Sequence, residues 1–194
     1  MAGPRPAAGL LLLTGGRGRR FGGPKHLQPH PAGGTWGGHL VRVFETVFPG
    51  CPLQVLGEAL PDRPDLPPLQ DPRQGPAAAL RHWAGTPRPG PQRWWVAACD
   101  QVRWNPEALA EWHAAVQAAD PGAGRWVLAR YQGRIQPLGG FLAEVLVDRL
   151  PAIPGASLMA LVDALPCVVL DSESNVWADL DTGEDREAYL KGLS

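Results

Sequence analysis

The 194-residue chain carries a formal net charge of −1, with 44% hydrophobic and 19% charged residues. This balance supports a packed core and argues against a disordered chain. It also gives no dominant basic face for nucleic acid. The length fits one domain, so we expect a single domain over residues 1–194, with residues 1–8 as a loose N-terminal tail.

The cysteines and the apolar runs argue against several other kinds of protein. Cys51, Cys99 and Cys167 are widely spaced and form no CxxC pair, so neither a disulfide framework nor a zinc site is indicated. The apolar run at 10–13 is too short for a transmembrane helix or a convincing signal peptide. We therefore expect a cytoplasmic protein without a membrane partner.

In the first half of the chain, short apolar runs alternate with segments of helical spacing. We expect, in order, a buried strand at 10–14, a glycine- and arginine-rich loop at 15–25, a helix at 39–48, a strand at 52–57, a proline-rich surface loop at 61–72, a helix at 75–83 and a strand at 93–99. Gly75-Pro76 favours a helix start, because a proline in the first turn leaves no N–H without a partner.

The same alternation continues in the second half. We expect a helix at 106–119, a strand at 125–131, an irregular or strand-like return at 133–141, a helix at 142–150, a helix at 157–165 capped by Ser157, a strand at 167–171, a short strand at 176–180 and a closing helix at 182–190. This order predicts an α/β layered fold with a mainly parallel sheet. Such sheets bind ligands at the carboxyl ends of their strands.

The segment 13–25 reads LTGGRGRRFGGPK and follows the first expected strand. Glycines let a backbone approach a ligand closely, and successive N–H groups form a concavity for anions. Arg17, Arg19, Arg20 and Lys25 add positive charge, and Lys25 is one of only two lysines in the chain. The combination suits a triphosphate, although neither a Walker A loop nor a Rossmann GxGxxG motif is present. A mobile surface loop is the alternative.

Carboxylates provide two further candidates. Asp100 directly follows the apolar run 94–99, where it can hold Mg²⁺ at the sheet edge. Taken alone, a turn or helix-capping role before Pro106 is the simpler interpretation. Asp179 and Asp181 alternate in a segment expected to be extended, so they face the same side and offer further metal ligands. Asp181 or Thr182 fits the N-cap of the closing helix equally well.

A turn reading DPRQGP at 71–76 leads into the second expected helix. A glycine at such a junction, here Gly75, lets the backbone recognise the edge of a base. On chemistry alone, a plain connection between loop and helix is the simpler interpretation of this segment.

Together, these segments resemble the molybdenum cofactor guanylyltransferase family of the nucleotidyltransferase superfamily. The family's opening pattern LAGGxSxRMGxxK is similar to the segment 13–25, and its closing NxNTPED is similar to DLDTGED at 179–185. Asp71 and Gly75-Pro76 match an aspartate before a helix start of the form GPLxG. Cys99-Asp100-Gln101 matches a strand end CDxP, and Gln136-Pro137-Leu138 matches a later PL segment.

The resemblance implies a three-layer α/β/α, Rossmann-like nucleotide-diphospho-sugar transferase fold. It implies transfer of GMP from Mg²⁺-bound GTP to molybdopterin-bound molybdenum cofactor, giving molybdopterin guanine dinucleotide and pyrophosphate, with other molybdenum-cofactor biosynthesis proteins as partners. The implied catalytic residues are Lys25, Arg19 and Asp100; the implied nucleotide-binding residues are Leu13, Thr14, Gly15, Gly16, Lys25, Asp71, Gly75 and Asp100; the implied Mg²⁺ ligands are Asp100, Asp179 and Asp181.

Several positions depart from the family pattern. Thr14 stands where the family has alanine, and Asp179 and Asp181 stand where it has asparagines. Pro24 precedes Lys25, a pair that is more common in related cytidylyltransferases than the Asp-Lys of this family. Two alternatives to guanylyl transfer therefore stay open: a cytidylyl- or sugar-nucleotide transferase, and a binding protein that has lost turnover.

Overall fold

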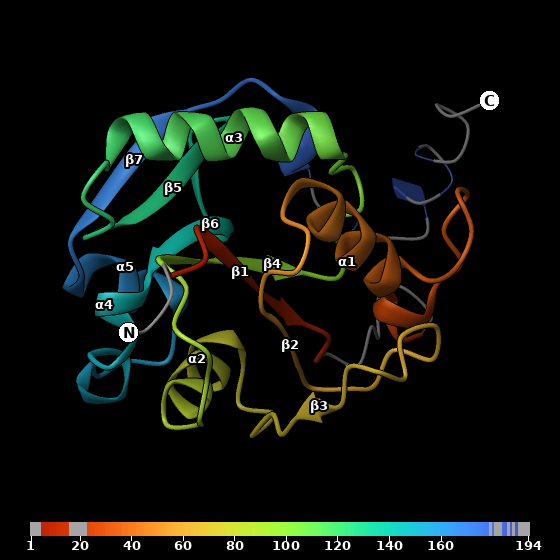
Figure 1. The fold of residues 1–194 in the computed structure, drawn as a ribbon, viewed down its shortest axis with the longest axis horizontal. Coiled ribbons are helices and arrows are strands. Elements are labelled where there is room, and N and C mark those ends of the chain that lie inside the picture. Colours follow the sequence, from red (N-terminus) through yellow and green to blue (C-terminus); the bar gives the residue numbers. More distant parts are fainter. Residues whose placement is uncertain are drawn as a thin grey trace.

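The computed structural model describes residues 5–15, 23–178, 180, 184, 185, 187 and 189. Within this part of the chain, seven strands form one sheet in the order β3-β2-β1-β4-β6-β5-β7 (Figure 1). The strands are β1 (Ala8–Leu13), β2 (Leu53–Leu56), β3 (Pro68–Leu69), β4 (Arg93–Ala98), β5 (Trp126–Tyr131), β6 (Arg134–Ala143) and β7 (Cys167–Asp171). β6 runs antiparallel to β4 and β5, and the other pairings are parallel. The predicted α/β fold with a mainly parallel sheet is confirmed.

Helices cover both faces of this sheet. α1 (Trp36–Val47) and α3 (Pro106–Ala119) lie on one face, and α2 (Pro76–Ala84), α4 (Glu144–Val147) and α5 (Leu158–Ala164) lie on the other (Figure 1). The pleat of β1 explains the division. Leu10 and Leu12 join the apolar cluster of α1 and α3, whereas Leu11 and Leu13 join that of α2, α4 and α5, because successive side chains of a strand point to opposite faces. The molecule therefore has the three layers that the sequence predicts.

Side-chain caps decide where the longer helices begin. The Thr35 hydroxyl accepts a hydrogen bond from Gly38 N, so α1 starts at Trp36, before the apolar spacing that indicated a helix from residue 39. Asn105 caps α3 in the same way, and Ser157 caps α5 as predicted. Each cap supplies an acceptor for an N–H that has no partner within its helix. No helix among the described residues is long and apolar enough to cross a membrane.

Strands β1 and β3 differ from the prediction. Ala8 belongs to β1 rather than to a loose tail, because it is fully buried and lies opposite Arg93 of β4. β3 falls within the segment 61–72 that the sequence predicts as a surface loop, and its Pro68 and Leu69 pair with β2. A strand of this length at a sheet edge carries almost no periodic signal, and proline is compatible with an edge position.

The expected helix at 142–150 begins later than predicted. Leu142 and Ala143 are the last residues of β6, and they lie opposite Trp94 and Arg93 of β4. Helical structure is confined to α4 and to a 3₁₀ turn, η2 (Leu150–Ala152). Both strand residues are fully buried, so their apolar character reflects pairing at the centre of the sheet rather than one face of a helix.

The expected strand at 176–180 is wrong. Its first residues belong to a 3₁₀ turn, η3 (Asn175–Trp177), which the Ser174 side chain caps. Val176 and Trp177 fill the core cluster of α1 and α3 instead of pairing with a strand. Beyond this turn, residues 184, 185, 187 and 189 are helical, in line with the predicted closing helix.

Candidate functional site

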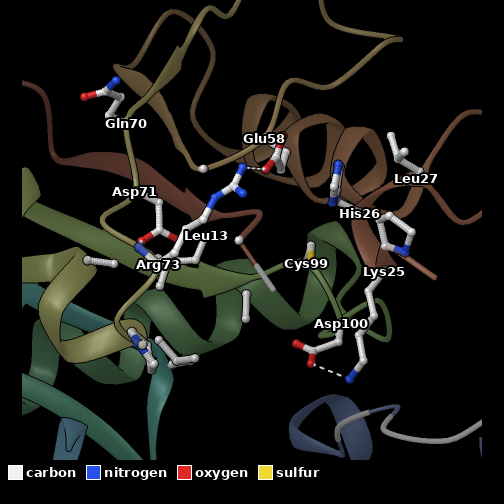
Figure 2. A pocket seen from close by; sticks show the side chains of 18 residues that line it. Leu13, Lys25, His26, Leu27, Glu58, Gln70, Asp71, Arg73, Cys99 and Asp100 are labelled. Atoms are coloured by element: carbon white, nitrogen blue, oxygen red, sulfur yellow. Dashed lines mark hydrogen bonds and ion pairs between the residues drawn. The ribbon is translucent and has the colours of Figure 1, made fainter. Parts of the chain in front are cut away.

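A cavity of about 1320 Å³ lies at the carboxyl ends of β1, β2 and β4. Leu13 and Gly15 come from the end of β1, Gly57 and Glu58 follow β2, and Ala98, Cys99 and Asp100 end and follow β4. The start of α2 and the 3₁₀ turn η1 (Lys25–Leu27) complete the wall (Figure 2). This is the edge at which the sequence predicts a ligand site, since parallel strands deliver their following loops to one side of the sheet.

Lys25 and Asp100 meet at one end of the cavity. Lys25 Nζ lies 2.9 Å from Asp100 Oδ2, and the dashed line between them in Figure 2 marks this ion pair. The two side chains are 16% and 21% exposed, so the charges are screened less than on an open surface. The structure thus brings together two residues that the sequence singles out from separate motifs.

Thr14, which the sequence predicts to bind nucleotide, lies directly after the end of β1. It is fully buried and does not line the cavity. Its backbone N–H donates to Leu56 O at 3.0 Å, and its hydroxyl accepts from Glu58 N at 2.7 Å. Thr14 therefore joins the ends of β1 and β2 beneath the cavity and holds Glu58 at its rim; its predicted role in nucleotide binding stays a prediction.

Asp71 stands directly against the backbone of Gly15. A Cβ atom at Gly15 would overlap with Asp71 Oδ2. The other oxygen, Oδ1, accepts a hydrogen bond from Arg73 N at 2.8 Å, and the Arg73 guanidinium pairs with Glu58 Oε1 at 2.7 Å (Figure 2). Gly57 approaches from the other side, where a Cβ would lie 2.6 Å from Gly15 N. The glycines are required here because three segments converge on one point.

Gly75 opens α2 at the cavity wall. Its φ of 92° lies in the left-handed region, which glycine adopts without a steric cost. Pro76 then occupies the first turn of the helix, as the sequence predicts. Leu13, Pro76 and Ala79 add apolar surface to this end of the cavity, beside the polar group of Glu58, Asp71 and Arg73. The Lys25–Asp100 ion pair lies at the other end.

Sequence reasoning did not assign a role to several residues that line the cavity, among them His26, Gly57, Glu58 and Arg73. The sequence does contain a signal for Glu58, because this carboxylate follows strand β2 as Asp100 follows strand β4. Burial lowers the pKa of His26, and the negative charge of Glu58 opposes that shift. The contacts of His26 and Arg73 join segments distant in the chain, so no local pattern indicates them.

Gln101 is a buried support for the Asp100 loop. It is 1% exposed; its Oε1 accepts from Ala98 N at 3.2 Å and its Nε2 donates to Leu138 O at 3.0 Å. The side chain satisfies backbone groups left where β4 ends. Beside it, burial first and the charge of Asp100 second raise the pKa of the Cys99 thiol above its usual range.

Part of the predicted site falls outside the described residues. Gly16 and Arg19 of the glycine loop lie there, as do Asp179 and Asp181. In the part of the chain that the structure does describe, no group of three or more His, Cys, Asp or Glu side chains is arranged to hold a metal ion. Of the three predicted metal ligands, Asp100 is the one that lies among the described residues.

A mainly parallel sheet that carries a glycine-lined cavity, with a lysine and an aspartate beyond its strand ends, is typical of nucleotide-binding α/β proteins. Residues 10–168 match the family model described as the MobA-like NTP transferase domain, and the chain belongs to this family of nucleotidyltransferases. Comparison with curated protein sequences gave no match.

Solved structures similar to this chain share its fold at low sequence identity. Rv0371c from Mycobacterium tuberculosis H37Rv has a TM-score of 0.69 at 22% identity, over 94% of this chain and 97% of that one. Another structure of Rv0371c is a complex with manganese, with a TM-score of 0.64 at 20% identity, over 97% and 100% of the two chains.

Two further structures carry names that state a nucleotide product. Molybdopterin-guanine dinucleotide biosynthesis protein A from Archaeoglobus fulgidus has a TM-score of 0.69 at 17% identity, over 96% of this chain and 100% of that one. The corresponding values for 4-diphosphocytidyl-2C-methyl-D-erythritol synthase are 0.65 and 13%, over 100% of each chain. The chain thus has the nucleotide-diphospho-sugar transferase fold that its family resemblance implies.

We predict that Gly15→Ala weakens binding of a nucleoside triphosphate by tenfold or more, on the order of the loss of one charged contact, because the new methyl group displaces the Asp71 carboxylate. The melting temperature without nucleotide changes little, since Asp71 is able to move into the cavity. Titration of nucleotide against intrinsic tryptophan fluorescence measures the affinity.

Gly90→Ala is the matched control, because a Cβ there meets nothing within 4 Å. Equal affinity of the Gly15 and Gly90 variants for nucleotide would show that close packing of Asp71 against Gly15 has no part in binding.

Proposed function

We propose that this chain is a Mg²⁺-dependent guanylyltransferase, which transfers GMP from GTP to molybdopterin-bound molybdenum cofactor and releases pyrophosphate. The observation that carries the proposal is the Lys25–Asp100 pair, 2.9 Å apart, at the charged end of a cavity that Gly15 also lines. Membership of the MobA-like family supports nucleotidyl transfer, and the resemblance of the sequence to the molybdenum cofactor guanylyltransferases supports guanine.

In the proposed reaction, a phosphate oxygen of the pterin attacks the α-phosphorus of GTP, and the bond to the β-phosphate breaks as pyrophosphate leaves. The protein contributes position and charge rather than a covalent intermediate. Lys25 neutralises negative charge on the α- and leaving phosphates. The backbone at Gly15 approaches the phosphates closely, and Asp71 and the Gly75 turn hold the nucleoside.

Asp100 fits a ligand of a hard divalent cation. Magnesium binds through one or two carboxylates and substrate phosphate oxygens while keeping several waters, and when bound here it would supply charge neutralisation between Asp100 and the triphosphate. Only Oδ2 of Asp100 contacts Lys25, so Oδ1 is the oxygen that we assign to the cation. Asp179 and Asp181 are proposed as further ligands.

A cytidylyl transferase is the second candidate. Pro24, the residue that favours it in the sequence, lines the cavity next to Lys25. The 4-diphosphocytidyl-2C-methyl-D-erythritol synthase structure shares the fold over the whole chain. Both candidates use the same charged end of the cavity and differ at the end that receives the base.

Lys25→Ala is expected to lower the rate of pyrophosphate release by on the order of 10²–10³, as removal of one electrostatic contact in a transition state does. The fold persists because the pair lies at the cavity and not in the core. The measurement is steady-state pyrophosphate release with molybdenum cofactor, and Arg130→Ala, whose side chain is 45% exposed in an ion pair with Asp171, is the control. Unchanged turnover in Lys25→Ala would remove this residue from the mechanism.

Asp100→Asn is expected to abolish Mg²⁺-dependent pyrophosphate release while leaving the melting temperature within a few degrees of the parent protein. Asparagine keeps the shape of the side chain and removes the charge that a cation requires. Asp171→Asn, at a carboxylate that is 80% exposed, is the matched control. If Asp100 only shapes the turn, asparagine serves equally well, and both activity and its Mg²⁺ dependence are retained.

The choice of base is tested by ligand-induced stabilisation, since a ligand that binds only the folded state raises the melting temperature. With Mg²⁺ present, we expect GTP to raise it more than CTP, ATP or UTP. The largest shift with CTP would instead assign the chain to the cytidylyl transferases.

A further inference from the structure

A set of buried hydrogen bonds outside the cavity lining links the segment that follows the Lys25 turn to the loop that follows Asp100. Tyr189 Oη lies 3.1 Å from His30 Nε2 and 3.3 Å from Val102 O. His30 Nδ1 accepts a hydrogen bond from Ala32 N at 3.1 Å. The Tyr189 side chain thus touches the segment that follows the Lys25 turn and also the loop that follows Asp100.

The direction of each hydrogen bond follows from the atoms present. Because Ala32 N–H donates to His30 Nδ1, that nitrogen carries no proton, and neutral His30 carries its proton on Nε2. His30 Nε2 therefore donates to Tyr189 Oη, and the hydroxyl hydrogen of Tyr189 is left to donate to Val102 O. With His30 neutral, each hydrogen bond in this set has one donor and one acceptor. A proton added to Nδ1 would leave no acceptor for Ala32 N–H.

The surroundings of His30 favour that neutral form. Burial, with the nearby His39 and Arg42 of α1, lowers the pKa of His30 to about 4, against a smaller opposing effect of the Val102 carbonyl. Arg42 is itself 3.7 Å from Asp62, and the Arg103 guanidinium stacks over the Tyr189 ring at 5.1 Å. His30 thus binds its proton less readily than in the unfolded chain, and the chain of hydrogen bonds is weakened as the pH falls toward 4.

The same elements are held at two further points. The His39 ring stacks on His30 at 3.7 Å, and His39 Nε2 contacts Trp104 O at 2.9 Å. Tyr189 also belongs to a small apolar cluster with Trp36, Val102 and Leu180. Leu180 stands between Asp179 and Asp181 in the sequence. The same apolar cluster therefore holds Leu180 from the end of the chain and Val102 from the Asp100 loop.

We propose that Tyr189 and His30 are positioning residues, whose hydrogen-bonded crosslink holds the Lys25 turn and the Asp100 loop at the separation that the phosphates require. The part of this inference that concerns turnover rests on the proposed nucleotidyl transfer; the part that concerns the two segments does not. Tyr189 touches neither the cavity nor its charges and acts through the backbone of Val102 and the ring of His30.

The test is Tyr189→Phe, which removes the hydroxyl and keeps the ring against Val102 and Arg103. We expect faster amide hydrogen exchange in both segments 25–35 and 100–104, with no change in β1 and β4. We also expect kcat for pyrophosphate release to fall about tenfold, with the KM for the triphosphate unchanged, as a small misplacement of charged groups produces. Tyr131→Phe, whose hydroxyl contacts only the exposed Gln132 side chain among the described residues, is the matched control.

His30→Asn supplies the second arm, because its side-chain oxygen is able to accept from Ala32 N while the contact with Tyr189 is lost. If the crosslink is the active unit, the double variant is no slower than either single variant, since interacting residues give non-additive effects. The proposal is overturned if the losses of kcat in the two single variants add up in the double variant. It is also overturned if one of the two segments exchanges at the rate of the parent protein in both single variants.

The two proposals fail separately. If the parent protein releases no pyrophosphate with any triphosphate, the proposed function fails, and the crosslink is judged by hydrogen exchange alone. Loss of protection in both segments then supports it, and protection equal to that of Tyr131→Phe refutes it.

Discussion

The ion pair between Lys25 and Asp100 joins two segments whose positions depend on the centre of the sheet. β1 and β4 are adjacent and parallel, with Leu13 opposite Ala98 at their ends, so the loops that follow them emerge side by side. A lysine on one loop and an aspartate on the other attract each other strongly in a partly buried setting. The opposite charges are the two groups to which we assign a phosphate and a cation in the proposed reaction.

Buried polar side chains hold the backbone around this pair. Strands that stop at the cavity leave N–H and C=O groups without ladder partners, and such groups are costly to bury unsatisfied. Thr14 serves the backbone of Glu58, Gln101 serves Ala98 and Leu138, and Tyr189 serves Val102. These buried hydrogen bonds therefore anchor the backbone of the loops that surround the cavity.

Known proteins share the fold of this chain. The molybdopterin-guanine dinucleotide biosynthesis protein and the 4-diphosphocytidyl-2C-methyl-D-erythritol synthase share this fold with the chain at 17% and 13% identity. A fold of this kind supports several nucleotides and acceptors, so selectivity depends on the residues of the site. In this chain, Glu58, Asp71 and Arg73 form a hydrogen-bonded group in the wall near Gly15, and they are the polar groups at the end that we assign to the nucleoside.

The sequence by itself determined the fold class and the meeting of Gly15, Lys25 and Asp100 at one edge, because apolar runs mark buried strands and parallel strands share their carboxyl ends. Tertiary structure alone decided the antiparallel β6, the 3₁₀ turn at Asn175–Trp177 and the buried place of Thr14. It also brought Arg73 to Glu58 and Tyr189 to His30. Those outcomes depend on contacts between segments far apart in the chain, and the local periodicity of a sequence carries no information about which distant segment will become the partner.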